Sequence, residues 1–432
     1  MIKAKRYSNQ LGYIVIVLLI LVRMPAAFSL SDNFLVRGIA LFPILILVFG
    51  TIFLRLYIGN LKFSMRKWGL VAVIYGCFMC LSLIQAIFRN TTDIPRIIGN
   101  FTLPILVALM CVVLYSNLSE IELWRFYAAI FWMFFIYVIL NLVLWILGIY
   151  SRSDVFIEPR SSLLLSYLGL NFYRVTFPMA TGINSFGYTA GMVLISGLIL
   201  FIKTSGWKKY LGVFSILVGL IVILLVDARS ALFFSFVAFI VFLLKIKPSK
   251  MWWIVVLALL LPLLFLYTLR NLPDEWISVI SRSGRDALTL SNRTIIWQTA
   301  IDTLSPFRLH HLIGWGYRGQ IPSGIMERYV TLFSNYQQIN SIPLHNSYLQ
   351  YLIDMGYLGL IFFVIMLILF LKDISKQSLR SSSVWLLIMK GIVIFLIISS
   401  SFDAVLTVDS QETFITFLLI LFGTILRGDD KI

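Results

Sequence analysis

The sequence has 432 residues, of which 60% are hydrophobic and only 12% are charged. A soluble domain of this length could not hide so much apolar surface in its own interior, so we expect lipid to be part of its solvent. The net charge of +16 does not indicate nucleic-acid binding, because the sequence has no separate soluble basic domain to carry it.

Apolar runs of about 20 residues recur along the whole chain, and each is long enough to cross roughly 30 Å of hydrocarbon. The first run follows the basic segment MIKAKRYSNQ, but Arg23 interrupts it, so we expect an uncleaved first helix rather than a signal peptide. The runs predict an all-α polytopic membrane protein with about 12 transmembrane helices. The predicted spans are 11–30, 35–54, 68–88, 97–115, 124–149, 182–202, 210–227, 230–244, 251–269, 347–371, 384–402 and 412–426.

Positive charge is distributed unequally between the two sets of loops. Lysines occupy the loops after every second span, at Lys62, Lys67, Lys203, Lys208, Lys209, Lys245, Lys247, Lys250, Lys372 and Lys376. By the positive-inside rule these loops and both termini are expected in the cytoplasm, although the loop at 116–123 lacks the signal.

The opposite face is expected to carry arginine and no lysine. Its arginines are Arg89, Arg96, Arg152, Arg160, Arg174, Arg229, Arg270, Arg282, Arg285, Arg293, Arg308, Arg318 and Arg328. Orientation control and ordinary surface arginines would explain many of these singly. As a set they suggest a phosphorylated ligand, because a guanidinium grips phosphate oxygens with two parallel hydrogen bonds.

Two segments on this face, 150–181 and 270–346, are too long to be simple connectors, and such loops usually carry function. We therefore divide the chain into N-terminal spans (1–175), spans with an outer arginine turn (176–269), a long outer loop (270–346) and C-terminal spans (347–432).

Within the long loop, SNRTIIWQTAIDTL predicts an amphipathic helix at the membrane surface, capped by Ser291 or Asn292. Its apolar face would contain Ile296, Trp297, Ala300, Ile301 and Leu304. Arg293 lies in the first turn, where the helix dipole disfavours a cation. Either a bound anion at the helix N-terminus or pairing with Asp286 would offset this.

The following segment, SPFRLHHLIGWGYRG, has glycines that permit tight turns around Trp315 and Tyr317. These two aromatic residues could stack on a sugar, but we expect them to anchor the loop in the membrane interface. His310 and His311 are interpreted as loop residues.

His345 precedes a span that begins with polar residues. Asn346 or Ser347 is expected to cap that helix, and Asn346, Gln350 and Asp354 recur every four residues and so share one face. An ionisable residue at this depth is costly beside lipid, so the face should point into the bundle or a water-filled cavity, with His345 at its rim.

Arg229 lies in VDARSALFF, a turn so short that the arginine is held at the hydrocarbon boundary. A local salt bridge with Asp227 is the alternative explanation.

These motifs in this order resemble the O-antigen ligase and polymerase superfamily. The resemblance covers about Thr176 to Leu360 and rests on ATGINSFGYTAG, DARSALFF, SNRTIIWQTA, LIGWGYRG and HNSYLQYLIDMGYLGL. It implies a GT-C-like helical bundle whose outer loop covers the active site, and it carries the family's essential residues over to Arg229, Arg293 and His345. Further candidates for diphosphate or substrate binding are Arg285, Arg318, Arg174, Asn184, Asn346 and Asp354.

The resemblance also implies the activity. We expect a metal-independent, inverting glycosyltransferase without a cofactor, which polymerises undecaprenyl-diphosphate-linked repeat units outside the bacterial plasma (inner) membrane. A ligase that transfers the glycan to lipid A core is the nearest alternative, and a lipid-linked oligosaccharide flippase is an alternative of another class. The expected partners are lipid-linked donor and acceptor, the bilayer and a chain-length regulator, with no nucleic acid.

Overall fold

The computed structural model describes residues 2–21, part of 46–57, 65–89, 94–115, 120–149, 161–180, 182–271, 273, 292–333 and 342–426. The predicted span 35–54 lies largely outside these residues, as do Arg285 and Asp286. In the described part the protein is helical, and the only β-type pairing there is an isolated bridge between Ser161 and Tyr173.

The long helices are α1 (Ile2–Leu21), α4 (Gly69–Phe88), α5 (Ile94–Tyr115), α6 (Glu120–Ile146), α8 (Ile183–Lys203), α9 (Trp207–Val226), α10 (Arg229–Leu243), α11 (Trp252–Arg270), α15 (Ser347–Arg380), α16 (Val384–Ser399) and α17 (Gln411–Ile425). Most of them match predicted spans to within a few residues, but α1 begins nine residues before its predicted span and α15 continues nine residues beyond its own. Among the described residues, α4, α6, α8, α9 and α15 are long and apolar enough to cross a membrane. Shorter elements are α7 (Leu163–Ser166), α13 (Arg293–Thr303), α14 (Ile325–Tyr329) and the 3₁₀ turns η1 (Pro248–Lys250), η2 (Leu309–Leu312) and η3 (Val330–Phe333).

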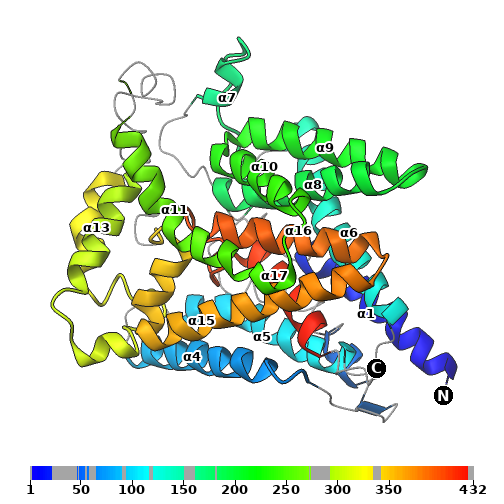
Figure 1. The fold of residues 1–432 in the computed structure, drawn as a ribbon, viewed down its shortest axis with the longest axis horizontal. Coiled ribbons are helices and arrows are strands. Elements are labelled where there is room, and N and C mark those ends of the chain that lie inside the picture. Colours follow the sequence, from blue (N-terminus) through cyan, green and yellow to red (C-terminus); the bar gives the residue numbers. More distant parts are fainter. Residues whose placement is uncertain are drawn as a thin grey trace.

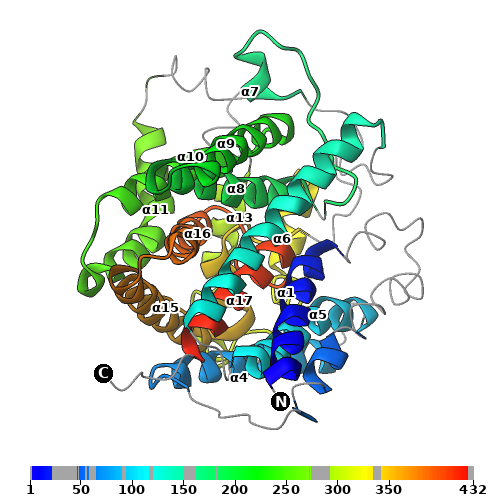
Figure 2. The same cartoon turned by 90° about the vertical axis from the view of Figure 1, so that its right-hand side faces the viewer.

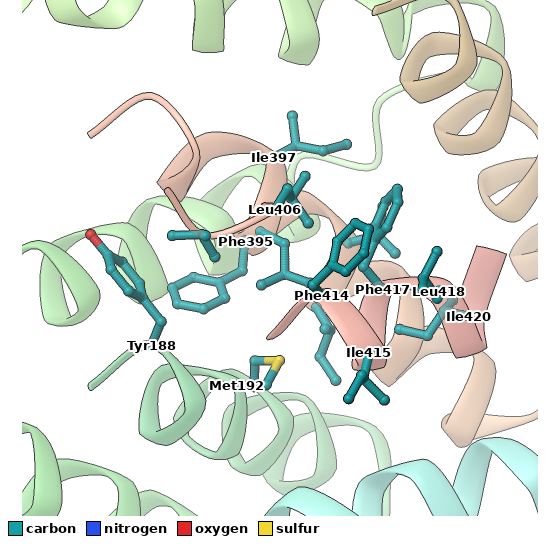
Figure 3. Close-up of a cluster of buried hydrophobic side chains, with 14 of the residues drawn as sticks. Tyr188, Met192, Phe395, Ile397, Leu406, Phe414, Ile415, Phe417, Leu418 and Ile420 are labelled. Atoms are coloured by element: carbon teal, nitrogen blue, oxygen red, sulfur yellow. The ribbon is translucent and has the colours of Figure 1, made fainter. Parts of the chain in front are cut away.

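Two helices near the C-terminus form the centre of the bundle. Both α16 and α17 are apolar on nearly every face, which favours complete burial. Figures 1 and 2 show them in orange and red among α6, α8, α10 and α15. Figure 3 shows the apolar cluster where Tyr188 and Met192 of α8 meet Phe395 of α16 and Phe414 of α17, with the Tyr188 hydroxyl at its margin.

Small residues bring α8 and α9 into backbone contact. A Cβ at Gly197 would lie 2.8 Å from the carbonyl oxygen of Gly212, and a Cβ at Gly212 would lie 2.7 Å from the amide of Phe201. Because lipid provides no hydrophobic driving force between helices, membrane helices usually associate through such close backbone packing. At the start of α8, Gly187 similarly admits Ala228, whose Cβ would be 2.3 Å from an added Cβ.

The two ends of the bundle differ in chemistry. We call the end with the turns 227–228 and 400–410 the site end. The other, which we call the lysine end, has the turns 204–206, 244–251 and 381–383. At the lysine end, Asp373 of α15 accepts hydrogen bonds from Arg66 Nη1 (2.7 Å) and Trp68 Nε1 (3.0 Å).

The long helix α15 is broken at Gly356, which has φ 71° and ψ −173°. The break leaves the carbonyl groups of Ile353 and Asp354 for the outer loop, and Trp315 and Gly316 donate their amides to these oxygens at 2.9 Å. The interrupted backbone is therefore paired within the protein, as irregular backbone inside a membrane must be.

Candidate active site

A carboxylate that the sequence analysis did not single out lies at the centre of the site. Asp403 follows α16, and its two oxygens bind two of the predicted catalytic residues: Oδ2 is 3.2 Å from Arg293 Nη2, and Oδ1 is 3.0 Å from His345 Nδ1. The side chains of Arg293 and His345 remain 15% and 18% exposed, against 9% for Asp403. The arginine and the imidazole can therefore meet a ligand, with the carboxylate behind them.

The turn that carries Asp403 is buried and held by hydrogen bonds. Ser347 Oγ donates to the Asp403 carbonyl at 3.0 Å and accepts from the Leu406 amide at 3.1 Å. The Tyr351 hydroxyl donates to the Leu406 carbonyl, and the Ala404 amide donates to Asp403 Oδ1 at 2.9 Å. The start of α15 thus fixes the carboxylate that orients His345.

Asp403 is ionised despite its burial. Burial alone would raise its pKa, but the charges of Arg293 and His345, with the hydrogen bonds from His345 and Ala404, outweigh that effect and lower the pKa to about 2. Because an ionised carboxylate only accepts hydrogen bonds, the Nδ1 of His345 must carry the proton that they share. The Nε2 of the ring is then left for a ligand.

Each of the three segments that bear Arg229, Arg293 and His345 contains a residue in the left-handed region. Asp227 (φ 52°) lies in the turn two residues before Arg229, Asn292 (φ 70°) directly precedes Arg293, and His345 itself has φ 50°. Such conformations are costly for residues other than glycine and persist where the surrounding fold demands them. The strain therefore lies at His345 or within two residues of the two arginines that the motifs predicted.

Arg229 is linked to this cluster through Tyr188. The Tyr188 hydroxyl lies 2.9 Å from Ser230 Oγ, next to Arg229 in the first turn of α10. The same hydroxyl hydrogen-bonds Arg293 and lies within the electrostatic reach of Asp403. The α9–α10 turn and the start of α13 are thereby held beside each other, and Arg229 is half-buried there.

Arg174 lies behind the same turn. Its Nε donates to the carbonyl of Val226 at 3.0 Å, and the neighbouring Val175 amide donates to the Leu225 carbonyl at 2.9 Å. These bonds tie the loop before α8 to the C-terminus of α9. Asn184 is half-buried in the first turn of α8, where the adjacent Ser185 donates to Glu412 Oε2 at 2.9 Å.

Helix α13 forms as predicted, with one correction to its buried face. Ile296, Trp297, Ala300 and Leu304 are buried, but Ile301 is 50% exposed, because the helix packs on a narrower face than the periodicity suggested. Asn292 is the N-cap, although its side chain makes no capping hydrogen bond.

The position of α13 is set by Trp297, whose Nε1 donates to the Leu344 carbonyl at 2.9 Å, beside His345. Figure 1 shows α13 beyond the left ends of the horizontal helices, running across them. The anion expected at the N-terminus of α13 is supplied by Asp403, since its carboxylate meets Arg293 in the first turn.

The GWGYRG segment anchors the outer loop inside the protein rather than in the membrane interface. Trp315 and Tyr317 are 9% and 5% exposed, and Tyr317 OH donates to Asp409 Oδ1 at 2.7 Å. Asp409 also accepts from Arg318 Nη2 at 2.8 Å. Arg318 therefore pairs with a carboxylate of its own, apart from the bonds that join Arg293, Asp403 and His345.

The polar face of α15 points into the bundle, as predicted. Asp354 accepts hydrogen bonds from the Gly319 amide (2.8 Å) and Gln350 Nε2 (2.9 Å), so it supports the outer loop. Asn346 caps α15 by accepting from the Leu349 amide at 3.0 Å, and it donates to the Ser401 carbonyl at 2.9 Å. The contacts of Asn346 fix the start of α15 beside His345, and those of Asp354 hold the 314–319 segment against the same helix.

Two site residues were missed by the sequence analysis, Asp403 and Tyr188. A carboxylate directly after an apolar span, in SSSFDAVLTVDS, is an ionisable group at the edge of the membrane, and that placement was a readable signal. Tyr188 gave no such signal, because a tyrosine within an apolar run is commonly a packing residue.

Fold and site together define a helical membrane protein with an arginine–histidine–aspartate cluster at one end of its bundle. Residues 214–364, which include Arg229, Arg293 and His345, match the family model described as O-antigen ligase. The matched segment is roughly a third of the chain, and the match supports the resemblance to the O-antigen polymerase and ligase superfamily that the motifs predicted. No curated protein matches the sequence.

Proposed function

We propose that this protein transfers a glycan from undecaprenyl diphosphate to an acceptor sugar, with Arg229, Arg293 and His345 as its catalytic residues. The observation that carries the proposal is the bridge from Asp403 to both Arg293 and His345. It holds a guanidinium and an imidazole side by side, and this supports the proposal because departure of a diphosphate requires an anion-binding group and attack by a hydroxyl requires a proton acceptor.

In the proposed reaction, the acceptor hydroxyl oxygen attacks the anomeric carbon while the bond from that carbon to the diphosphate oxygen breaks. Negative charge develops on the departing undecaprenyl diphosphate. Arg293 uses one guanidinium nitrogen for Asp403 and has further N–H donors for phosphate oxygens, and Arg229 approaches from the neighbouring turn. Fixed cations at a low-dielectric membrane edge would stabilise this charge without a metal.

His345 would act as the general base. With Nδ1–H bonded to ionised Asp403, a neutral ring presents the Nε2 lone pair, which takes the proton of the acceptor hydroxyl. A single displacement of this kind inverts the anomeric configuration. A protonated His345 that donates a hydrogen bond to the diphosphate is the competing role, and it predicts the opposite dependence of rate on pH.

We propose a repeat-unit polymerase in which donor and acceptor are both lipid-linked glycans, with the site end outside the bacterial plasma membrane and the termini in the cytoplasm. The lysine-rich turns at the opposite end of the bundle support this orientation. The description of the matched family favours the second candidate, a ligase that transfers the glycan to lipid A core. For a flippase, cationic groups would be expected along a central path, whereas Arg229 and Arg293 both lie at the site end.

The deciding experiment replaces Arg229, Arg293 or His345 by alanine in the native strain and examines the banding of the surface polysaccharide. A polymerase predicts glycan shortened to one repeat unit on core, with the variant protein still inserted in the membrane. A core without glycan, together with long lipid-linked polymer, would instead establish the ligase. Normal banding in all three variants would refute both.

A further inference from the structure

A lysine is buried in the centre of the bundle, near the lysine end. Lys390 lies in α16, about 9 Å along the helix from its first residue, and it is only 6% exposed. Figure 2 shows α16 enclosed by α8, α10, α11 and α15, and each of these helices packs against it. An ionisable residue inside a membrane bundle is expensive and usually has a functional reason.

Within the part of the chain that the structure describes, the ammonium group of Lys390 forms no hydrogen bond and no ion pair. Its Nζ lies 5.9 Å from the centre of the Phe242 ring, at the outer limit of a cation–π contact. That contact is weak compared with the cost of removing an ammonium from water. A charged ammonium at this place would therefore be stabilised by an anionic partner.

The contact with Phe242 shows where the ammonium group of Lys390 lies in the bundle. Phe242 lies in the last turn of α10, just before the segment 244–251 that leads to α11. This segment reads LKIKPSKM, so it has three lysines and no carboxylate, and Lys245, Lys247 and Lys250 are all exposed. The buried ammonium thus lies near the last turn of α10, which leads into a lysine-rich segment.

We propose that Lys390 and the segment 244–251 bind the phosphate headgroup of an anionic membrane lipid. The ligand class follows from charge complementarity, since this end of the bundle has the buried ammonium of Lys390 and a segment with three lysines and no carboxylate. The membrane is indicated as its source by the exposed, stacked indoles of Trp252 and Trp253 beside this segment, because indole rings typically lie at the level of lipid headgroups.

The test uses the purified full-length protein in uncharged detergent micelles and measures its melting temperature. Phosphatidylglycerol should raise the melting temperature of the wild-type protein by about 2 °C, and phosphatidylcholine should not. In Lys390→Met, which keeps a flexible side chain of similar length, the melting temperature without lipid should rise, because an unpaired buried charge is removed. Phosphatidylglycerol should then have no further effect on it.

A matched control is Lys372→Gln, which removes an exposed lysine of α15 toward the same end. It should keep the response to phosphatidylglycerol, and titration should show at least tenfold weaker lipid binding in Lys390→Met alone. An equal response of wild type and Lys390→Met would overturn the proposal, as would a stabilisation that inorganic phosphate reproduces. The readout does not involve glycan transfer, so it stands apart from the proposed function.

Discussion

Replacing Asp403 with asparagine removes one charge and almost no volume. In the folded protein the carboxylate holds Arg293 at 3.2 Å and His345 at 3.0 Å. An asparagine amide would turn its NH₂ group toward one of these donors, so that one partner would lose its acceptor. We expect Asp403→Asn to lower both the stability of the protein and its rate of glycan transfer.

The stability effect follows from the pKa of Asp403, which is about 2 in the folded protein against an ordinary 3.8. Because the folded pKa is the lower one, the ionised carboxylate stabilises the folded state above about pH 4. That stabilisation is lost as the pH falls through about 2. The difference between the two values corresponds to about 2–3 kcal/mol of unfolding free energy.

The assay is thermal unfolding of purified wild type and Asp403→Asn in detergent from pH 7 down to pH 2. The wild-type protein should be the more stable by about 2–3 kcal/mol at neutral pH, and the difference should shrink as acid protonates Asp403. Parallel curves at every pH would refute the reasoning, because they would mean that the charge of Asp403 does not stabilise the folded protein.

Measuring the rate of glycan transfer in Asp403→Asn distinguishes a role of Asp403 in the proposed reaction from a role in stability alone. Loss of the group that orients a catalytic histidine is expected to reduce the rate by about 10²–10⁴-fold. Asp373→Asn is the matched control, because Asp373 is also a buried carboxylate with an arginine partner but lies at the lysine end. It should lose stability and keep its transfer rate; an equal loss of rate in both variants would contradict the proposed site.

Three further predictions concern single groups. If His345 is a base, the transfer rate should be higher at alkaline than at acidic pH, and the opposite dependence would make it a donor to the diphosphate instead. Tyr188→Phe should weaken binding of undecaprenyl diphosphate about tenfold, and its combination with Ser230→Ala should be less than additive, because both remove the same hydrogen bond. Gly356→Ala should lower the free energy of unfolding by about 3 kcal/mol or more, because its φ is positive and an added Cβ would lie 2.4 Å from the backbone of Leu312. Gly76→Ala is the control, and it should leave the free energy of unfolding unchanged because the space around Gly76 is open.

The helical architecture could be predicted because it depends on local properties. A run of apolar residues long enough for the membrane becomes a helix wherever it occurs, since an unpaired backbone cannot remain in lipid. For the same reason Asn346 could be predicted as the cap of α15, and the face with Gln350 and Asp354 could be predicted to point inward. The exposure of Ile301 was misjudged, because periodicity gives the direction of an apolar face and the neighbouring helices set its width.

The sequence by itself determined that this is a helical membrane protein and which arginines and histidine to examine, because hydropathy and motif order are properties of the chain. Only the tertiary structure decided how they meet. Asp403 is separated from Arg293 by 110 positions and from His345 by 58, and Tyr188 reaches Ser230 across 42. No local pattern encodes such pairs, since they form only when the folded chain brings distant backbones together, as Gly187 does where it admits Ala228 beside Tyr188 and Ser230.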